Sequence, residues 1–374
     1  MGSLDDAVRA RNDAIAAAGR WRSVRPLRDG SVRTQLADGT PVVHFASNDY
    51  LGLSQHPAVV DAAHRALDTY GAGAGASRLI VGHRPVHDEL EAALAAWKGT
   101  ESALVFPTGF AANLGVLGAL VGAGGRDDTV VFSDELNHAS IIDGIRAARA
   151  QVCVVPHLDL HRLEHGLRSR TRRHAVVVSD SVFSMDGDVA PVDDLAALCA
   201  RHDAVLVLDE AHAVLGPDHP AGADCAVVVV GTLSKTLGSV GGYVAADRAV
   251  VDLCVNTSRS FIFTTASAPS DSAAALAAVG VVTGAEGDAL RARLRAHVET
   301  IRPGHPSPVV PVVLGTEAAA LDAAAGLLAQ GLLVPAIRPP TVAEGTCRLR
   351  IALSAAHDPH DVDRLGRALA ALVP

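Results

Sequence analysis

The lysines of this sequence are its first chemical feature, because the chain of 374 residues contains only two, Lys98 and Lys235. Lys235 follows the apolar run at residues 226–230 and precedes the glycine-rich stretch TLGSVGG, so it lies in a turn after a predicted buried strand. Most lysines are solvated, and Lys98 in AAWKGTES fits that ordinary surface role. Arginine stays protonated, whereas a desolvated lysine amine can lose its proton and form a Schiff base with a carbonyl. The sequence therefore predicts Lys235 as a nucleophilic amine.

A carboxylate and a histidine follow another predicted buried strand, in AVLVLDEAHAV, which places Asp209 and His212 just beyond it. The D-E-A-H pattern is known from nucleotide triphosphatases, but a carboxylate here can instead pair with the protonated pyridine nitrogen of pyridoxal phosphate (PLP). The first alternative requires a G-x-x-x-x-G-K-[ST] phosphate loop. Lys98 is followed by glycine and Lys235 is preceded by serine, so neither lysine fits that loop. The PLP alternative is therefore favoured.

Three further segments place glycine or polar residues after predicted strands. In VFPTGFAANLGVL, Gly109 and Phe110 stand at a helix entrance, where free N–H groups and the helix dipole can hold a phosphate. SDELNHASIIDG places His138 ahead of a helix, and VVVSDSVFSMDGDVAPV places Ser181 and Ser184 after another strand. Taken alone, each segment also fits an ordinary turn, helix cap or surface group.

The elements that must position these residues are readable from the alternation of short Val-rich runs with helix-like segments. Such runs, bounded by turn residues, predict a mostly parallel sheet covered on both faces, with ligands at the carboxyl ends of its strands. Residues 4–19 predict an amphipathic helix. The expected organisation is an N-terminal helix and strands at 1–45, a large α/β domain at 46–275 and a small α+β domain at 276–374, with the two ends of the chain forming one small lobe.

The composition favours a protein that handles small molecules. Hydrophobic residues make up 49% of the chain and aromatic residues only 3%, so Ala, Val and Leu must fill the core. A net charge of −9 leaves no electrostatic footprint for nucleic acid or an anionic membrane. The five cysteines are widely spaced, which predicts neither a disulfide framework nor a metal site, and the N-terminal segment lacks the apolar core of a signal peptide. We expect a soluble, cytoplasmic protein.

Nine motifs in one order, between Arg22 and His357, resemble fold-type I PLP-dependent enzymes and specifically the α-oxoamine synthase family. This resemblance implies a large domain with a mostly parallel, seven-stranded type of sheet, PLP as cofactor, and a homodimer with active sites at the subunit interface. The motifs are SNDYLGLSQHP, GASRLIVGHRPVHDELE, PTGFAANLGVL, LNHASIIDGIR, DSVFSMDGDVAP, LDEAHAV, GTLSKTLGSVGGY, FIFTTASAP and RPPTVAEGTCRLRIALSAAH.

The same resemblance assigns a role to each matching position. Lys235 would bind the cofactor covalently and later move the α-proton of the substrate, and Asp209 would pair with the pyridine nitrogen. His212 would hydrogen-bond the phenolic oxygen of the ring, and His138 would stack on its open face. The other assigned positions are the phosphate contacts Gly109, Phe110 and Thr232, joined by Thr264 or Thr265 of a second subunit; the ring-oxygen contact Ser184; and the substrate contacts Arg22, Asn48, Thr341 and Arg350.

The reaction implied by the resemblance is a decarboxylating Claisen condensation of an L-amino acid with an acyl thioester. VFSMDGDVAP and RPPTVAEGTCRLR are most similar to the member that joins L-alanine to pimeloyl-CoA or a pimeloyl carrier protein, giving 8-amino-7-oxononanoate in biotin synthesis.

Two departures keep other substrates open. The sequence HAV after D-E-A resembles glycine-using members of the family, and the segment from His212 to Lys235 is shorter than usual and lacks a Gly-Arg-Gly turn. A related synthase that uses glycine or another amino acid with a different thioester is therefore one alternative. A PLP-binding chain without activity is another, and the intact set of Lys235, Asp209 and His212 argues against it.

Overall fold

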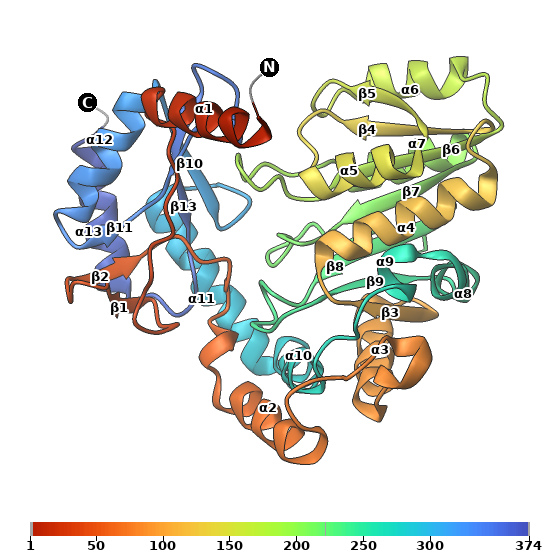
Figure 1. Ribbon diagram of the computed structural model, residues 1–374, viewed down its shortest axis with the longest axis horizontal. Helices are drawn as coiled ribbons and strands as arrows, with labels where there is room; N and C mark the ends of the chain where they lie inside the picture. The colour runs from red at the N-terminus through yellow and green to blue at the C-terminus, as the bar shows by residue number, and fades with distance from the viewer. Residues whose placement is uncertain (1–2, 221, 373–374) are drawn as a thin grey trace.

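The structure is a computed structural model that describes residues 3–220 and 222–372. Its largest unit is a seven-stranded sheet with the strand order β3-β9-β8-β7-β6-β4-β5 (Figure 1). Strand β9 is antiparallel to both of its neighbours, and the other pairs are parallel. The predicted mostly parallel, seven-stranded sheet is thereby confirmed. Its strands are β3 (Ser102–Phe106), β4 (Thr129–Asp134), β5 (Gln151–Val155), β6 (His174–Asp180), β7 (Ala204–Asp209), β8 (Val227–Thr232) and β9 (Gly242–Ala246).

The Val-rich strands form the centre of this sheet because both of its faces are buried. Successive side chains of a strand point to opposite faces. In β6, Val176 and Val178 accordingly pack in one apolar cluster, while Ala175 and Val177 pack in another. The first face is covered by α4 (Gly109–Gly124), α5 (Ala139–Ala148), α8 (Arg248–Thr257) and α9 (Arg259–Ile262), and the second by α6 (Leu160–Ser169) and α7 (Val192–Arg201).

Strands from both ends of the chain build the smaller lobe. Strand β11 of the C-terminal part pairs in parallel with β2 of the N-terminal part, so the two ends share a sheet. The fold-level prediction of a small lobe from both termini agrees with this pairing, whereas the boundaries at residues 45 and 275 stay predictions. Its two three-stranded sheets and four helices are β1 (Arg33–Gln35), β2 (Pro41–His44) and β11 (Leu332–Leu333); β10 (Val309–Gly315), β13 (Cys347–Ala352) and β12 (Ala336–Ile337); and α1 (Leu4–Ala17), α11 (Ala285–Ile301), α12 (Glu317–Leu328) and α13 (Pro359–Ala370).

Three helices lie at the lower side of Figure 1, below and between the two lobes. There α10 (Pro269–Val282) packs against α2 (Pro57–Tyr70) and α3 (Pro85–Lys98). Two short helical turns, a 3₁₀ turn at Leu53–Gln55 and a π turn at Arg78–Gly82, flank them. Among the described residues, no single helix is long and apolar enough to cross a membrane; the bent pair α10 and α11 passes that test only when both are taken together.

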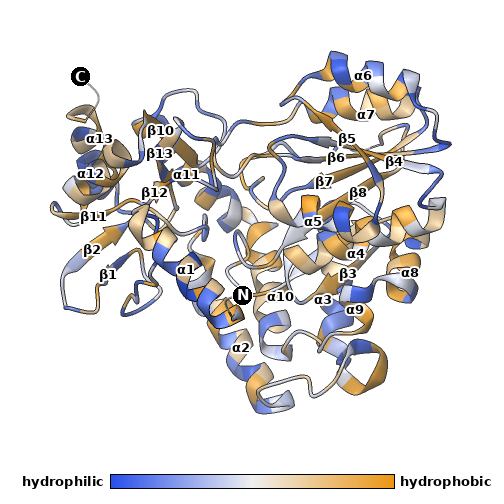
Figure 2. Ribbon diagram, turned by 45° about the horizontal axis from the view of Figure 1, so that its top comes forward, coloured by the Kyte–Doolittle hydropathy of each residue, from blue (hydrophilic) through white to orange (hydrophobic). Residues whose placement is uncertain are grey.

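Two local predictions need comment. The helix expected at residues 4–19 spans Leu4–Ala17, but it buries none of its residues, and Figure 2 shows hydrophilic residues along much of it. The interpretation of Lys98 as a surface lysine is wrong. Its side chain is buried, with Nζ 2.5 Å from Glu210 Oε2 and 4.2 Å from the centre of the Trp97 ring.

Candidate active site

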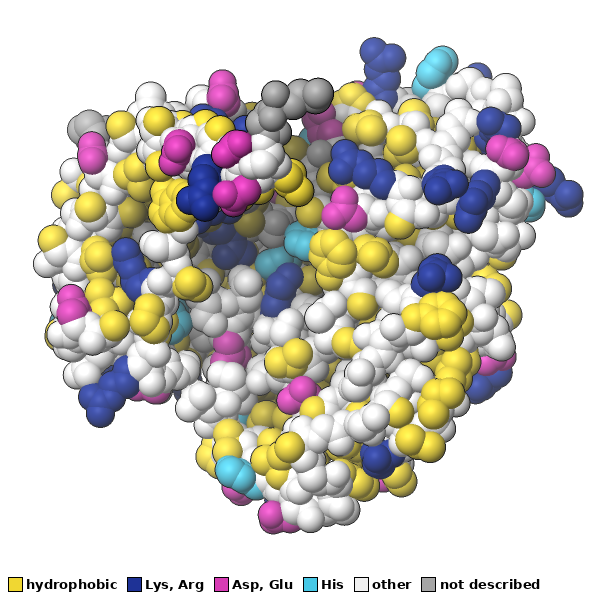
Figure 3. All heavy atoms as spheres, viewed as in Figure 1, with side chains coloured by type: hydrophobic (Ala, Val, Ile, Leu, Met, Phe, Trp, Pro, Cys, Tyr) yellow, Lys and Arg dark blue, Asp and Glu magenta, His cyan; other side chains and the backbone are white. Residues whose placement is uncertain are grey.

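The predicted chemical residues meet at the carboxyl ends of the central strands, on the side of the sheet that faces the small lobe (Figure 1). Asp209 is the last residue of β7, and Lys235 lies three residues after the end of β8. Figure 3 shows the surface hollowed between the two lobes, with histidine and basic side chains inside the recess. The candidate residues therefore lie together at the carboxyl ends of neighbouring strands, where open α/β sheets bind their ligands.

The amine of Lys235 is held by a buried histidine. Lys235 Nζ lies 2.8 Å from His212 Nε2, and His212 Nδ1 lies 2.6 Å from the hydroxyl of Tyr50. Burial lowers the pKa of His212 well below its ordinary value, so its ring is neutral and Nε2 can accept a hydrogen bond from the amine. Burial also lowers the pKa of Lys235, although the Asp209 and Asp180 carboxylates oppose this effect. A larger fraction of the amine is therefore neutral than for a solvated lysine, as a nucleophile requires.

The Asp209 carboxylate is fixed from several sides. Its Oδ2 accepts a hydrogen bond from Asn113 Nδ2 at 2.7 Å, and its Oδ1 accepts one from the backbone N–H of Ala211 at 2.9 Å. The Ser181 hydroxyl donates to the backbone carbonyl of Asp209 at 3.1 Å. A buried carboxylate with this support keeps a defined direction, which is what a partner for a protonated pyridine nitrogen needs.

His138 is placed by a second carboxylate. As the N-cap residue of α5, it donates its backbone N–H to Asp180 Oδ2 at 2.8 Å, and its Nδ1 lies 2.7 Å from Ser140 Oγ. Burial and the nearby charge of Asp209 raise the pKa of Asp180 well above its ordinary range. Burial lowers the pKa of His138, which favours a neutral flat ring. Such a ring can stack on an aromatic cofactor.

The first turn of α4 and the end of β8 bring together groups that could bind an anion. Gly109 and Phe110 are the first two residues of α4, so their N–H groups lack acceptors within the helix. A Cβ on Gly109 would lie 3.4 Å from Thr232 Cβ, so the helix terminus and the end of β8 lie side by side. The Thr232 hydroxyl lies 2.7 Å from Ser234 Oγ, which adds hydroxyl groups beside the free N–H groups.

Arg350 contacts two of the other predicted residues, Ser184 and Asn48. The buried Arg350 of β13 donates from Nε to the Ser184 carbonyl at 2.5 Å and from Nη2 to Asn48 Oδ1 at 3.1 Å. The Tyr50 hydroxyl also donates to Asn48 Oδ1, at 3.1 Å. Tyr50 therefore links the Arg350 group to His212 and Lys235.

The remaining predicted residues are not joined to this network by the hydrogen bonds of the described chain. Arg22 and Thr341 are exposed. The loop of Thr264 and Thr265 leads to Ala266, whose N–H donates to the Ala76 carbonyl at 3.0 Å. Contacts of Arg22 and Thr341 with substrate, and of Thr264 or Thr265 with a second subunit's cofactor, therefore stay predictions.

The donor set fits PLP. Lys235 offers an amine for its aldehyde, Asp209 a fixed carboxylate for its ring nitrogen, and His138 a flat ring. The start of α4, together with Thr232 and its hydroxyl neighbour, offers N–H and hydroxyl groups for its phosphate.

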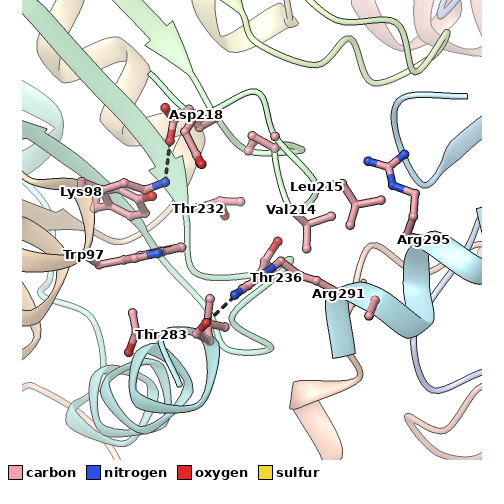
Figure 4. A pocket seen from close by; sticks show the side chains of 17 residues that line it. Trp97, Lys98, Val214, Leu215, Asp218, Thr232, Thr236, Thr283, Arg291 and Arg295 are labelled. Atoms are coloured by element: carbon pink, nitrogen blue, oxygen red, sulfur yellow. Dashed lines mark hydrogen bonds and ion pairs between the residues drawn. The ribbon is translucent and has the colours of Figure 1, made fainter. Parts of the chain in front are cut away.

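A separate cavity of about 660 Å³ lies on the Lys98 side of the loop that carries Lys235. Figure 4 shows Lys98 and Trp97 on one of its walls and Arg291 and Arg295 of α11 on another. Its lining includes Thr232 and Thr236, but not Lys235, Asp209 or His212, so this space is not the site of the Lys235 chemistry.

Comparisons with known proteins agree with this geometry. A family model for aminotransferase class I and II matches residues 40–369. The chain belongs to this family. One curated relative is the 8-amino-7-oxononanoate synthase of Anaeromyxobacter dehalogenans, 49% identical over 99% of this chain and 96% of the relative. The same enzyme of a Methylobacterium species is 48% identical over 98% of this chain and 96% of the relative.

Two solved structures of serine palmitoyltransferases closely resemble this chain in fold. Serine palmitoyltransferase of S. paucimobilis, with bound PLP–myriocin aldimine, superposes with a TM-score of 0.89 at 28% identity, covering 98% of this chain and 96% of the other. The serine palmitoyltransferase of Sphingomonas wittichii gives 0.89 at 30% identity, with 99% and 98% covered. The predictions of a fold-type I transferase, an α-oxoamine synthase and a PLP-dependent acyltransferase are thereby confirmed.

Several site residues of this aminotransferase-family chain were not identified from the sequence. Asn113 could have been noticed as a polar residue within the apolar helix α4. Asp180 ends β6 directly before Ser181, one of the two serines that the motif analysis named. Tyr50 lies within the SNDYLGL motif, but an isolated tyrosine gives no sign that its hydroxyl meets a histidine 162 residues away.

Proposed function

We propose that this chain catalyses the condensation of L-alanine with a pimeloyl thioester, releasing CO₂ and the free thiol and giving 8-amino-7-oxononanoate for biotin synthesis. Relatives of that name are 48–49% identical over nearly the whole chain. The observation that carries the proposal is the Lys235 amine, of lowered pKa, held by His212 beside the fixed Asp209 carboxylate.

PLP, when bound, supplies an electron sink that stabilises negative charge at the α-carbon of the substrate. Lys235 would hold the cofactor through its amine and would serve as the base for the α-proton of the substrate. His212 accepts a hydrogen bond from this amine and keeps it in place. Asp209, fixed by Asn113, would keep the ring nitrogen protonated. His138 would lie against the open face of the cofactor ring.

Arg350 is the proposed holder of the substrate carboxylate. Its guanidinium is buried and directed by two neutral acceptors, the Ser184 carbonyl and Asn48 Oδ1, so its positive charge is not neutralised by these contacts. A planar guanidinium can bind a carboxylate through two parallel hydrogen bonds. Release of that carboxylate as CO₂ then follows formation of the new carbon–carbon bond.

We further propose a homodimer in which the site is completed by a second copy. Large apolar side chains are exposed near the turn at Arg78–Gly82 and after α9: Leu79 is 50% exposed, Ile80 74%, Val81 67% and Phe263 70%. Monomeric surfaces rarely leave such residues together in water. Thr264 and Thr265 follow Phe263 directly, so an interface here would carry them toward a partner. We also propose that the enzyme acts in the cytoplasm, where its five free cysteines would stay reduced.

Glycine is the second candidate amino acid, favoured by the HAV that follows D-E-A and by the short connection to Lys235. The test supplies the PLP-loaded protein with L-alanine, glycine or L-serine and with pimeloyl-CoA or a pimeloyl carrier protein. We expect 8-amino-7-oxononanoate, detected by mass spectrometry, with one CO₂ and one free thiol per product. Turnover with glycine and absence of product with alanine would overturn the preferred substrate, and the two donors separate CoA from carrier protein.

A further inference from the structure

The turn after β6 bridges the two lobes. The Phe183 N–H donates to the Asp188 carbonyl at 3.0 Å, and the Gly187 N–H donates to the Phe183 carbonyl at 2.8 Å, which closes the turn. Gly187 has a φ of +70°, and a Cβ there would lie 1.9 Å from the Val309 carbonyl oxygen of β10. This turn, residues 184–188, therefore follows β6 of the large sheet and packs directly against β10 of the small lobe.

On the large-domain side, one histidine holds the turn. His157 Nε2 lies 2.6 Å from Asp188 Oδ2, and its Nδ1 lies 2.9 Å from Asp134 Oδ1 at the end of β4. Ionised carboxylates only accept hydrogen bonds, so the ring must donate from both nitrogens and carry a positive charge. Burial opposes this charge, but the bonds to Asp134 and Asp188 outweigh it and raise the pKa of His157 to about 10. The Phe183 ring also meets the His157 ring edge to face at 4.4 Å.

On the small-lobe side, two arginines of β13 hold the same turn. Arg348 forms an ion pair with Asp186, and Arg350 Nε donates to the Ser184 carbonyl at 2.5 Å. The backbone of β13 is fixed by its pairing with β10 and β12. The direction of the Arg350 guanidinium is instead set by its two acceptors, of which one, the Ser184 carbonyl, belongs to the turn.

We infer that His157 is a positioning residue for the amino-acid substrate, acting through the turn 184–188 on the guanidinium of Arg350. The inference rests on the proposed function, in which Arg350 binds the substrate carboxylate. Without the imidazolium, Asp134 and Asp188 would face each other without a cation between them and repel. The turn would move from its place, and the Ser184 carbonyl would no longer direct Arg350. The amine of Lys235 lies further along this network, beyond Asn48, Tyr50 and His212, so the guanidinium of Arg350 takes the main effect.

The test compares His157→Asn with His161→Asn, an exposed histidine of α6 that serves as matched control. Using PLP-loaded enzyme, the Kd for the amino acid is measured from the change in cofactor absorbance, together with KM, kcat and the thermal midpoint. We expect His157→Asn to raise Kd and KM for the amino acid by roughly tenfold with kcat within about twofold, and His161→Asn to change none of them. Asp188→Asn should behave like His157→Asn and replaces it if that variant does not fold.

A double-mutant cycle with Arg350→Ala tells whether His157 positions Arg350 or only stabilises the site as a whole. If His157 acts through Arg350, adding His157→Asn to Arg350→Ala leaves Kd unchanged. An unchanged Kd in His157→Asn alone, or an equal loss in both backgrounds, would overturn the inference. If Arg350→Ala itself leaves Kd unchanged, the proposed role of Arg350 fails instead, so the two failures are distinguishable.

Discussion

Lys98 is buried and Lys235 is partly buried, and their surroundings shift the pKa values of the two amines in opposite directions. Lys235 faces the neutral ring of His212, and burial lowers its pKa. Lys98 faces the Glu210 carboxylate; burial again opposes the charge, but Tyr243 and Glu210 outweigh it and raise the pKa of Lys98. Burial alone therefore does not make a lysine a nucleophile, because the charge of its partner decides which form is stable.

Two adjacent residues at the end of β7, Asp209 and the following Glu210, create this difference. Successive side chains at a strand end point to opposite faces, so Asp209 turns toward Asn113 of α4 while Glu210 turns toward Lys98 of α3. Glu210 also accepts hydrogen bonds from the backbone N–H and the ring of His219, at 2.8 and 3.0 Å. The D-E pair of the motif thus supplies one carboxylate to the cofactor side and one to a structural cluster of Lys98, Glu210 and His219.

The largest difference between the two lysines is expected when Lys235 is removed. Lys235→Ala should reduce kcat by at least ~10³-fold and remove the absorbance of the covalently bound cofactor, because the other lysine of the sequence, Lys98, is paired with Glu210. Lys98→Met is the matched control and should keep that absorbance in its folded fraction. Steady-state turnover and a visible spectrum check both variants. Normal turnover in Lys235→Ala would refute the assigned role.

Removal of the other amine should affect stability instead. Lys98→Met leaves the buried Glu210 carboxylate without its lysine, which should lower the free energy of unfolding by about 3–5 kcal/mol. The double variant Lys98→Met with Glu210→Leu should recover part of this loss, because no unpaired charge is then buried. Urea denaturation measures both variants. Equal destabilisation of the single and double variants would show that lost packing, rather than an unpaired charge, is responsible.

A smaller effect is expected from the third member of the cluster. The hydrogen bond to Glu210 raises the pKa of His219, so the stability it contributes is fully present below pH 6.5 and is lost as pH rises through the raised pKa. His219→Ala should therefore lower the free energy of unfolding by about 1–2 kcal/mol at pH 6, with a smaller loss at pH 9. Denaturation at both pH values checks this, and a deficit independent of pH would contradict it.

The sequence predicted the strands and most of their terminal residues because these depend on local patterns. Val-rich runs bounded by turns mark buried strands, and residues such as Asp209 and Lys235 follow them directly. The environment of Lys98 could not be predicted in this way, since its carboxylate partner lies 112 residues along the chain. The same holds for Asn113, whose contact with Asp209 spans 96 residues and depends on how α4 packs on β7.

The two amines can also be compared without any mutation, by measuring how fast each is acetylated. In cofactor-free protein treated briefly with acetic anhydride, the acetylation rate of Lys235 should rise with pH and level off below the ordinary lysine pKa of 10.5, because only the neutral amine reacts. Lys98 should stay unmodified until the protein unfolds, because Glu210 keeps its amine protonated and buried. Peptide mass spectrometry gives both rates from one sample, and denatured protein, in which both lysines should react alike, is the control. Faster labelling of Lys98 than of Lys235 at pH 8 would mean that the partner charge does not control amine reactivity in this protein.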